Sequence, residues 1–194
     1  MKQKLLILAG ILLIILALSA VTYKSRFAEK QKPQSELQDD AYIQTAMQLT
    51  SPSFEHNDKI PSLYTCDSEN INPPLTILNV PDGAKSLVLI MDDPDAVKPA
   101  GKVWDHWIVW NISPKTQEIK EGREPEGKFG IGSGNSRGYR GPCPPDGEHR
   151  YYFKLYALDR ELDIPEGSTK AEVESVMGSH ILAQTELIGL YERN

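Results

Sequence analysis

The chain has 194 residues, a net charge of −6 and a hydrophobic fraction of 40%, and it contains two cysteines. This hydrophobic fraction excludes wholesale disorder, and the acidic balance argues against the basic surface of a nucleic-acid-binding protein, so no nucleic-acid partner is expected. The charge is divided unevenly. Residues 1–32 hold six basic residues and one acidic residue, which gives +5, whereas the remainder holds 15 basic and 26 acidic residues, which gives −11.

The N-terminus carries a run without charge, from Leu5 to Val21, with basic residues on both sides. A buried core helix would show a polar stripe, which this run lacks, and roughly 17 residues are just enough to cross a bilayer. We therefore expect residues 1–22 to be a signal anchor or transmembrane helix. A cleaved signal peptide and secretion is the alternative, because small residues near Ala20 form a mediocre cleavage site. Either way, the body is expected outside the cytoplasm, in the periplasm or extracellular.

Residues 23–44 are polar, mixed in charge and without helical or strand periodicity, which is typical of a linker. Residues 45–194 then form a single domain in which strand patterns dominate. Strands are expected near 47–49 and at 86–91, 106–112, 151–158 and 183–191, and the continuous apolar run at 86–91 indicates a strand buried on both faces. Thr169 and Glu172 have the spacing of a capping box, which predicts one clear helix after them. The domain is thus mainly β, with one or two peripheral helices.

Polar and aromatic side chains gather at the ends of three expected strands, namely Asp93, then Trp104 and His106, and finally His149 and Tyr151. Strand alternation places Trp104 and His106 on one face and puts Asp105 and Trp107 on the other. A loop rich in glycine and proline precedes His149 and would leave backbone N–H groups free. This set of side chains (a carboxylate, two imidazoles, an indole and a phenol) suits a small oxyanion such as phosphate. The imidazoles would donate hydrogen bonds in their charged form, so we expect binding to be favoured at mildly acidic pH.

Two other chemistries use the same residues. A metal centre would need His106, His149 and Asp93 to converge, and no short two-histidine spacing supports that arrangement. Cys143 near His149 is a conceivable nucleophile, but the surrounding prolines are more typical of a pocket rim. We therefore expect no catalytic residue, no metal and no cofactor.

The motifs Asp-Asp-Pro-Asp-Ala at 92–96, Trp-Asp-His-Trp at 104–107 and Gly-Pro-Cys-Pro-Pro-Asp-Gly-Glu-His-Arg-Tyr at 141–151 resemble the signature of the phosphatidylethanolamine-binding protein family. Within that family, the motifs are most similar to those of the bacterial, Raf kinase inhibitor-like branch, and the resemblance extends over residues 45–193. The resemblance implies an antiparallel β-sandwich of two sheets with a small anion pocket at one end. The ligand-binding residues that it implies are Asp93, Trp104, His106, Gly141, His149 and Tyr151.

The function expected from these observations is non-catalytic binding of a small anionic, phosphate-bearing ligand or phospholipid head group by a membrane-tethered domain. Two alternatives stay open: inhibition or regulation of another enzyme through the protein surface, with the partner unnamed, and hydrolysis of a phosphoester. Cys66 and Cys143 are either two free thiols or a disulfide, which an oxidising compartment permits.

Overall fold

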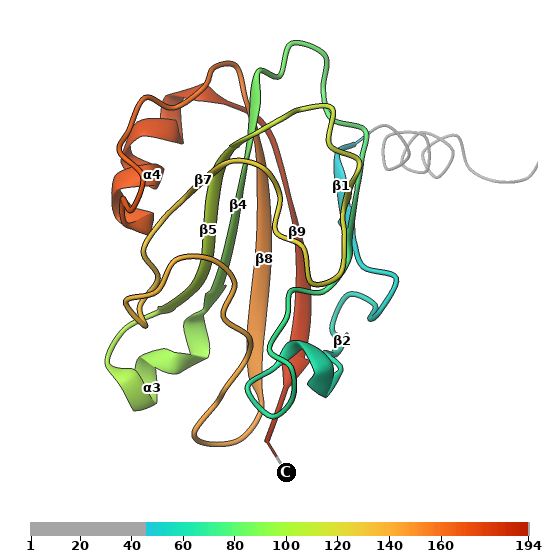
Figure 1. The fold of residues 1–194 in the computed structure, drawn as a ribbon, viewed down its shortest axis with the longest axis vertical. Helices are drawn as coiled ribbons and strands as arrows, with labels where there is room; N and C mark the ends of the chain where they lie inside the picture. The colour runs from blue at the N-terminus through green and yellow to red at the C-terminus, as the bar shows by residue number, and fades with distance from the viewer. Residues whose placement is uncertain (1–45, 194) are drawn as a thin grey trace, which may run out of the picture. The chain divides into compact units, whose positions relative to one another are not determined.

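Residues 46–193 are described by a computed structural model (Figure 1). The expected membrane helix at 1–22 and linker at 23–44 lie outside the described residues. Within 46–193, no helix is long and apolar enough to span a bilayer. The part of the chain that the structure covers is mainly β, with few helices, as predicted.

The strands, in chain order, are β1 (Gln48–Thr50), β2 (Asp58–Lys59), β3 (Leu75–Leu78), β4 (Ser86–Asp93), β5 (Trp104–Ile112), β6 (Glu118–Ile119), β7 (Lys128–Phe129), β8 (His149–Leu158) and β9 (Ile181–Tyr191). The helices are α3 (Val97–Ala100) and α4 (Lys170–Met177), and single 3-10 turns lie at Ser62–Tyr64, Pro94–Ala96 and Gly178–His180. One sheet has the order β1-β3-β6, and the other has the order β2-β9-β8-β4-β5-β7. The strands expected from the sequence are therefore present.

The large sheet is buried on both faces at its central strand, β4. On one face, Leu89 and Phe153 pack against Ile77 of the small sheet in the main core. On the other face, Val173 of α4 packs against Val88 of β4 in a second core cluster. Figure 1 shows α4 and β1 on opposite sides of the large sheet. Every residue of β4 is buried, which explains the continuous apolar run in its sequence.

The capping box predicted for the helix is confirmed. The Thr169 side chain accepts the backbone N–H of Glu172, and the Glu172 carboxylate accepts the backbone N–H of Thr169, at 3.4 and 2.7 Å. These two bonds satisfy N–H groups that a helix start otherwise leaves unpaired, so α4 begins at Lys170.

The expectation of two purely antiparallel sheets is wrong at one edge, because β2 pairs with β9 in parallel. All other strand pairs of the described residues are antiparallel. A hairpin would impose an antiparallel pair, but β2 and β9 lie at opposite ends of the domain sequence, and no hairpin joins them.

A register shift near the start of β5 decides how its side chains point. Met91 pairs with Trp107 and Asp92 pairs with Asp105, so β5 has one extra residue, His106, at this point. Such a bulge interrupts the alternation of side chains along a strand. Trp107 packs in the main core, whereas Asp105 approaches the first residue of α4 on the opposite face. The prediction that these two residues share a face is therefore wrong.

Candidate ligand-binding site

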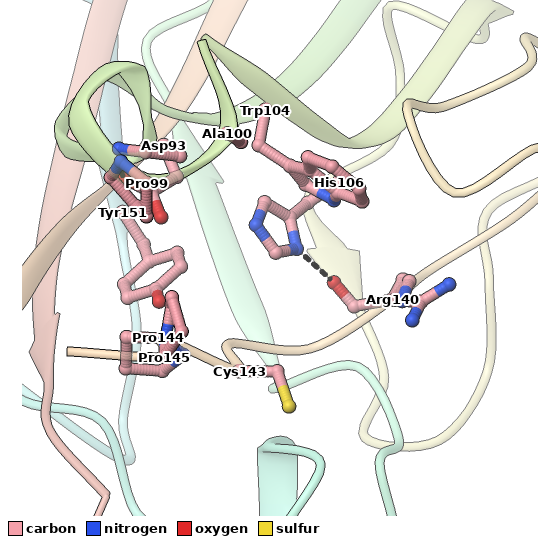
Figure 2. Close-up of a pocket in the computed structure, with 11 residues that line it drawn as sticks. Asp93, Pro99, Ala100, Trp104, His106, Arg140, Cys143, Pro144, Pro145 and Tyr151 are labelled. Atoms are coloured by element: carbon pink, nitrogen blue, oxygen red, sulfur yellow. Dashed lines mark hydrogen bonds between the residues drawn. The ribbon is translucent and has the colours of Figure 1, made fainter. Parts of the chain in front are cut away.

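A cavity of about 280 Å³ lies where the ends of β4, β5 and β8 meet α3 and the loop after Arg140 (Figure 2). Its walls are mostly apolar, with a few polar side chains among them. The lining residues are Asp93, Ala96, Pro99, Ala100, Trp104, His106, Arg140, Cys143, Pro144, Pro145 and Tyr151. Four of the six predicted ligand-binding residues are among them: Asp93, Trp104, His106 and Tyr151. The other two, Gly141 and His149, lie beside the cavity and do not line it.

Asp93 is a structural anchor at the edge of the cavity, and it is only 3% exposed. Its Oδ1 atom accepts the backbone N–H groups of Asp95 and Ala96, at 2.9 and 3.0 Å, and so caps the turn that leads into α3. Its Oδ2 atom lies 2.7 Å from Nδ1 of His149. Both carboxylate oxygens are therefore engaged by the protein itself.

His149 lies next to two residues that line the cavity: it contacts Asp93, and its ring stacks on that of Tyr151 at 6.5 Å between centroids. Its Nδ1 atom bonds to Asp93, and its Nε2 atom lies 3.5 Å from an oxygen of Asp146. The histidine contributes instead to a neighbouring, more open depression that also includes Lys98 and Arg150. His149 thus supports the cavity through Asp93 and Tyr151 and is not one of its lining residues, so its role as a ligand-binding residue stays a prediction.

Gly141 is required for close packing. A Cβ atom at this position would lie 2.1 Å from the carbonyl oxygen of Tyr64, which no side chain can tolerate. Its N–H donates to Oδ1 of Asn70 at 2.8 Å. The N–H of Gly141 is therefore already paired within the protein, and a ligand contact at this residue stays a prediction.

His106 presents one nitrogen to the protein and the other toward the cavity. Its Nδ1 atom lies 2.7 Å from the carbonyl oxygen of Arg140. Because a carbonyl only accepts, Nδ1 carries the hydrogen, and Nε2 of the neutral ring is an acceptor. Burial is the largest influence on the ring and lowers the pKa of His106, against the opposing effects of the Arg140 carbonyl and of Asp93. The structure thus favours a neutral acceptor in place of the charged donor expected from the sequence.

Tyr151 carries a buried hydroxyl that makes no hydrogen bond of standard geometry with the described residues. The Cys143 backbone and the Asp93 carboxylate are close enough to influence its pKa, but neither meets the geometry of a hydrogen bond. The side chain is 0% exposed, and its ring meets the His106 ring edge-on at 5.3 Å between centroids. Burial raises the pKa of Tyr151 far above its usual value, and the nearby charge of Asp93 adds to this, so the O–H group stays protonated. Buried polar groups are almost always paired, so an unpaired donor at a cavity indicates a place for a bound group.

The model of the phosphatidylethanolamine-binding protein family matches residues 50–192. The chain belongs to the phosphatidylethanolamine-binding protein family. It is 49% identical to a UPF0098 protein of Methanothermobacter thermautotrophicus over 153 residues, which cover 76% of this chain and 99% of that one.

Solved structures of the phosphatidylethanolamine-binding protein family agree with this fold. A homologue from Chlamydia trachomatis superposes with a TM-score of 0.73 at 46% identity, covering 77% of this chain and 99% of that one. The E. coli protein YbcL, described as a new member of the mammalian family, gives a TM-score of 0.70 at 29% identity, with 76% and 99% covered. The family predicted from the sequence motifs is confirmed.

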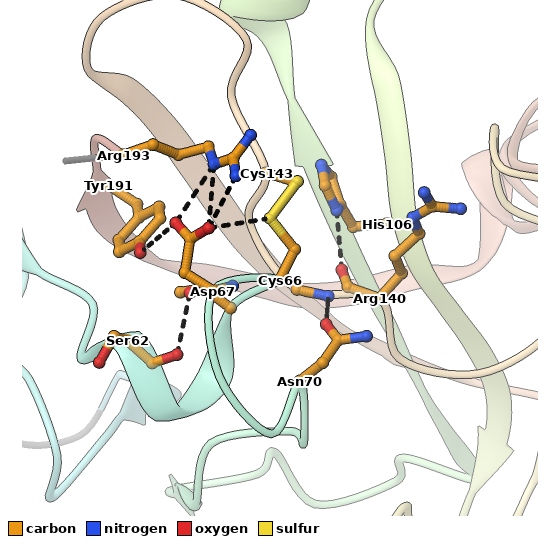
Figure 3. Close-up of a disulfide and its surroundings, with 11 residues drawn as sticks. Ser62, Cys66, Asp67, Asn70, His106, Arg140, Cys143, Tyr191 and Arg193 are labelled. Carbon is orange, nitrogen blue, oxygen red and sulfur yellow. Dashed lines mark hydrogen bonds and ion pairs between the residues drawn. A yellow bond between two sulfur atoms is a disulfide. The ribbon is translucent and has the colours of Figure 1, made fainter.

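In this family member, a disulfide between Cys66 and Cys143 supports one wall of the cavity (Figure 3). The two cysteines are 77 residues apart in the sequence, and Cys143 itself lines the cavity. The backbone N–H of Cys66 also donates to the carbonyl of Pro142 at 3.0 Å. The sequence left the disulfide and two free thiols as open alternatives. Because the Cys143 sulfur is bonded, it is not available as the nucleophile considered above.

Several contributors to the site carried no recognised signal in the sequence. Arg140 acts through its backbone carbonyl, which any residue could supply, and Figure 2 shows its guanidinium on the far side of that carbonyl from the His106 ring. Asn70 orients the loop through a contact that spans 71 residues. Among the described residues, no group of three or more His, Cys, Asp or Glu side chains is placed to hold a metal ion.

Proposed function

We propose that this chain is a non-catalytic binding protein for a small ligand with an anionic, phosphate-bearing head group, held in the cavity between Tyr151 and His106. The observation that carries this proposal is the unpaired, buried hydroxyl of Tyr151. An oxygen of a bound head group would accept its hydrogen bond. The family name, which refers to phosphatidylethanolamine, supports the same class of ligand.

The dimensions of the cavity favour a head group over a whole lipid. A volume of about 280 Å³ is just below the roughly 300–1,000 Å³ that is usual for ligand pockets. The half-buried Trp104 and the prolines of the rim provide apolar surface for the part of the ligand that stays outside. A phospholipid head group and a free phosphate ester share the chemistry that this cavity would recognise.

Binding without catalysis is supported by the state of the groups that could react. Asp93 is engaged by two backbone N–H groups and by His149, and Cys143 is in a disulfide. His106 is the remaining candidate base, and within residues 46–193 no serine or free thiol lines the cavity beside it. We therefore propose no reaction at this site.

We further propose that the domain acts outside the cytoplasm, tethered to a membrane through residues 1–22. The disulfide supports this placement, because such bonds persist in oxidising compartments and are rare in the cytoplasm. Sequencing the N-terminus of the mature protein in the membrane fraction tests the tether. An intact N-terminus is expected, and a start near Val21 would show a cleaved, released product instead.

Calorimetric titration of the purified full-length chain with phosphorylethanolamine tests the proposed function. Wild type should bind saturably, and Tyr151→Phe should bind at least about tenfold more weakly, because it loses one hydrogen bond to a charged group. Tyr152→Phe is a matched control, since Tyr152 is the next residue of β8 and is outside the cavity. Absence of binding by wild type, or equal affinities for all three proteins, would contradict the proposal.

A further inference from the structure

The cavity offers one hydrogen-bond donor and one acceptor to a bound group. The donor is the Tyr151 hydroxyl, which makes no hydrogen bond of standard geometry with the described residues, although Asp93 and the Cys143 backbone lie near it. The acceptor is Nε2 of His106: Nδ1 donates to the Arg140 carbonyl, and burial favours the neutral ring, in which the other nitrogen carries a lone pair. Figure 2 shows the second nitrogen of His106 on the side of the ring that faces Asp93 and Tyr151. A ligand that satisfies both groups must accept one hydrogen bond and donate another.

The charges around His106 reinforce this requirement. The titratable and charged groups about its ring are Asp92 and Asp93 from β4, Arg140 from the loop, and Tyr151 from β8, on which the His149 ring stacks in turn. Asp93 lines the cavity and brings negative charge to it, while the Arg140 guanidinium points away from the ring. An oxyanion without a proton would therefore direct its lone pairs at the lone pair of Nε2 and at a carboxylate.

We infer that this cavity selects an oxyanion that carries a proton of its own, such as a phosphate monoester monoanion, over an isosteric sulfate ester that has none. The inference rests on the proposed function and specifies the ligand within it. In the complex, the P–O–H group donates to Nε2 of His106, and the Tyr151 hydroxyl donates to another phosphoryl oxygen. A sulfate ester can accept a hydrogen bond from Tyr151, but it has no proton to donate, so one of its oxygens would face the lone pair of Nε2 of His106.

The proton requirement makes affinity depend on pH. The second pKa of a phosphate monoester is about 6, so the monoanion predominates at pH 5.5 and is a few per cent of the total at pH 7.5. Affinity for the phosphate ester should therefore fall roughly twentyfold between these two pH values. The opposite arrangement, a charged His106 that donates from both nitrogens, would accept sulfate and phosphate esters alike.

Titration of the full-length chain with methyl phosphate and methyl sulfate at pH 5.5 and 7.5 decides between these arrangements, and it needs no variant that might fail to fold. Methyl phosphate should bind at pH 5.5 at least about thirtyfold more tightly than methyl sulfate, because a polar site rejects a ligand that leaves its buried group unpaired. If the affinity for methyl sulfate is within threefold of the affinity for methyl phosphate, the proton requirement is overturned and the proposed function stays intact. Failure of both methyl esters and of phosphorylethanolamine to bind would overturn the inference and the proposed function together.

Discussion

The Oδ2 atom of Asp93 lies 2.7 Å from Nδ1 of His149, and both side chains are buried. Because Oδ1 of the same carboxylate caps the turn that leads into α3, Asp93 ties the start of β8 to one wall of the cavity. The pair therefore holds the shape of the site, and its contribution to ligand binding is indirect.

Replacing Asp93 by alanine should lower the free energy of unfolding by about 3 kcal/mol, because it leaves Nδ1 of the buried His149 unpaired and removes the cap of the turn before α3. Asp82→Ala is the control, since Asp82 is exposed in the turn between β3 and β4, and its removal should cost less than about 0.5 kcal/mol. Urea denaturation of both variants measures the difference. Similar losses in the two variants would show that the Asp93–His149 contact contributes little.

Tyr151→Phe should affect stability and ligand binding in opposite directions. Removing a buried hydroxyl that lacks a partner should leave the free energy of unfolding unchanged or raise it by about 1 kcal/mol, while the affinity for the ligand falls. Chemical denaturation in the absence of ligand provides the stability measurement. A loss of more than about 1 kcal/mol would indicate that the hydroxyl has a partner within the protein.

His106 should make the stability of the domain depend on pH. Burial lowers its pKa in the folded state below the value of about 6.5 in the unfolded chain, so the unfolded chain binds more protons between these two values. Stability is therefore greatest above pH 6.5 and decreases as the pH falls through this window. Urea denaturation at pH 7.5 and 5.5 measures this change for wild type and His106→Gln. The free energy of unfolding should decrease less in the variant than in wild type, and equal decreases would contradict the lowered pKa of His106.

Loss of the disulfide should weaken both the fold and the site. Replacing Cys66 and Cys143 together by serine should lower the free energy of unfolding by up to about 4–5 kcal/mol, the chain-entropy value for a loop of this length. Ligand affinity should fall as well, because Cys143 belongs to the cavity wall. Thermal unfolding with and without a reductant checks this: wild type should respond to the reductant and the double variant should not. If the reductant does not change the unfolding temperature of wild type, the two cysteines are free thiols.

The elements that the sequence predicted well are those whose signal is local. The apolar run of β4 reflects its burial on both faces, and the capping box marks the start of α4 within a few residues. The motifs shared with the family placed Trp104, His106 and Tyr151 at one cavity. In each case, neighbouring residues carry the information.

The details that the sequence did not predict depend on contacts between distant residues. The extra residue of β5 at His106 is visible only in its pairing with β4, because alternation alone gives no sign of a bulge. The partner of Nδ1 is a backbone carbonyl, which leaves no trace in residue type. Gly141 was assigned to the ligand, whereas its requirement comes from the Tyr64 carbonyl 77 residues earlier.

The crystal structure of the full-length chain with phosphorylethanolamine tests the central claim most directly. We predict the phosphoryl group in the cavity, with separate oxygens within about 2.5–3.2 Å of the Tyr151 hydroxyl and of Nε2 of His106. A phosphoryl group bound elsewhere, or one in the cavity that leaves the Tyr151 hydroxyl without a contact, would contradict this account.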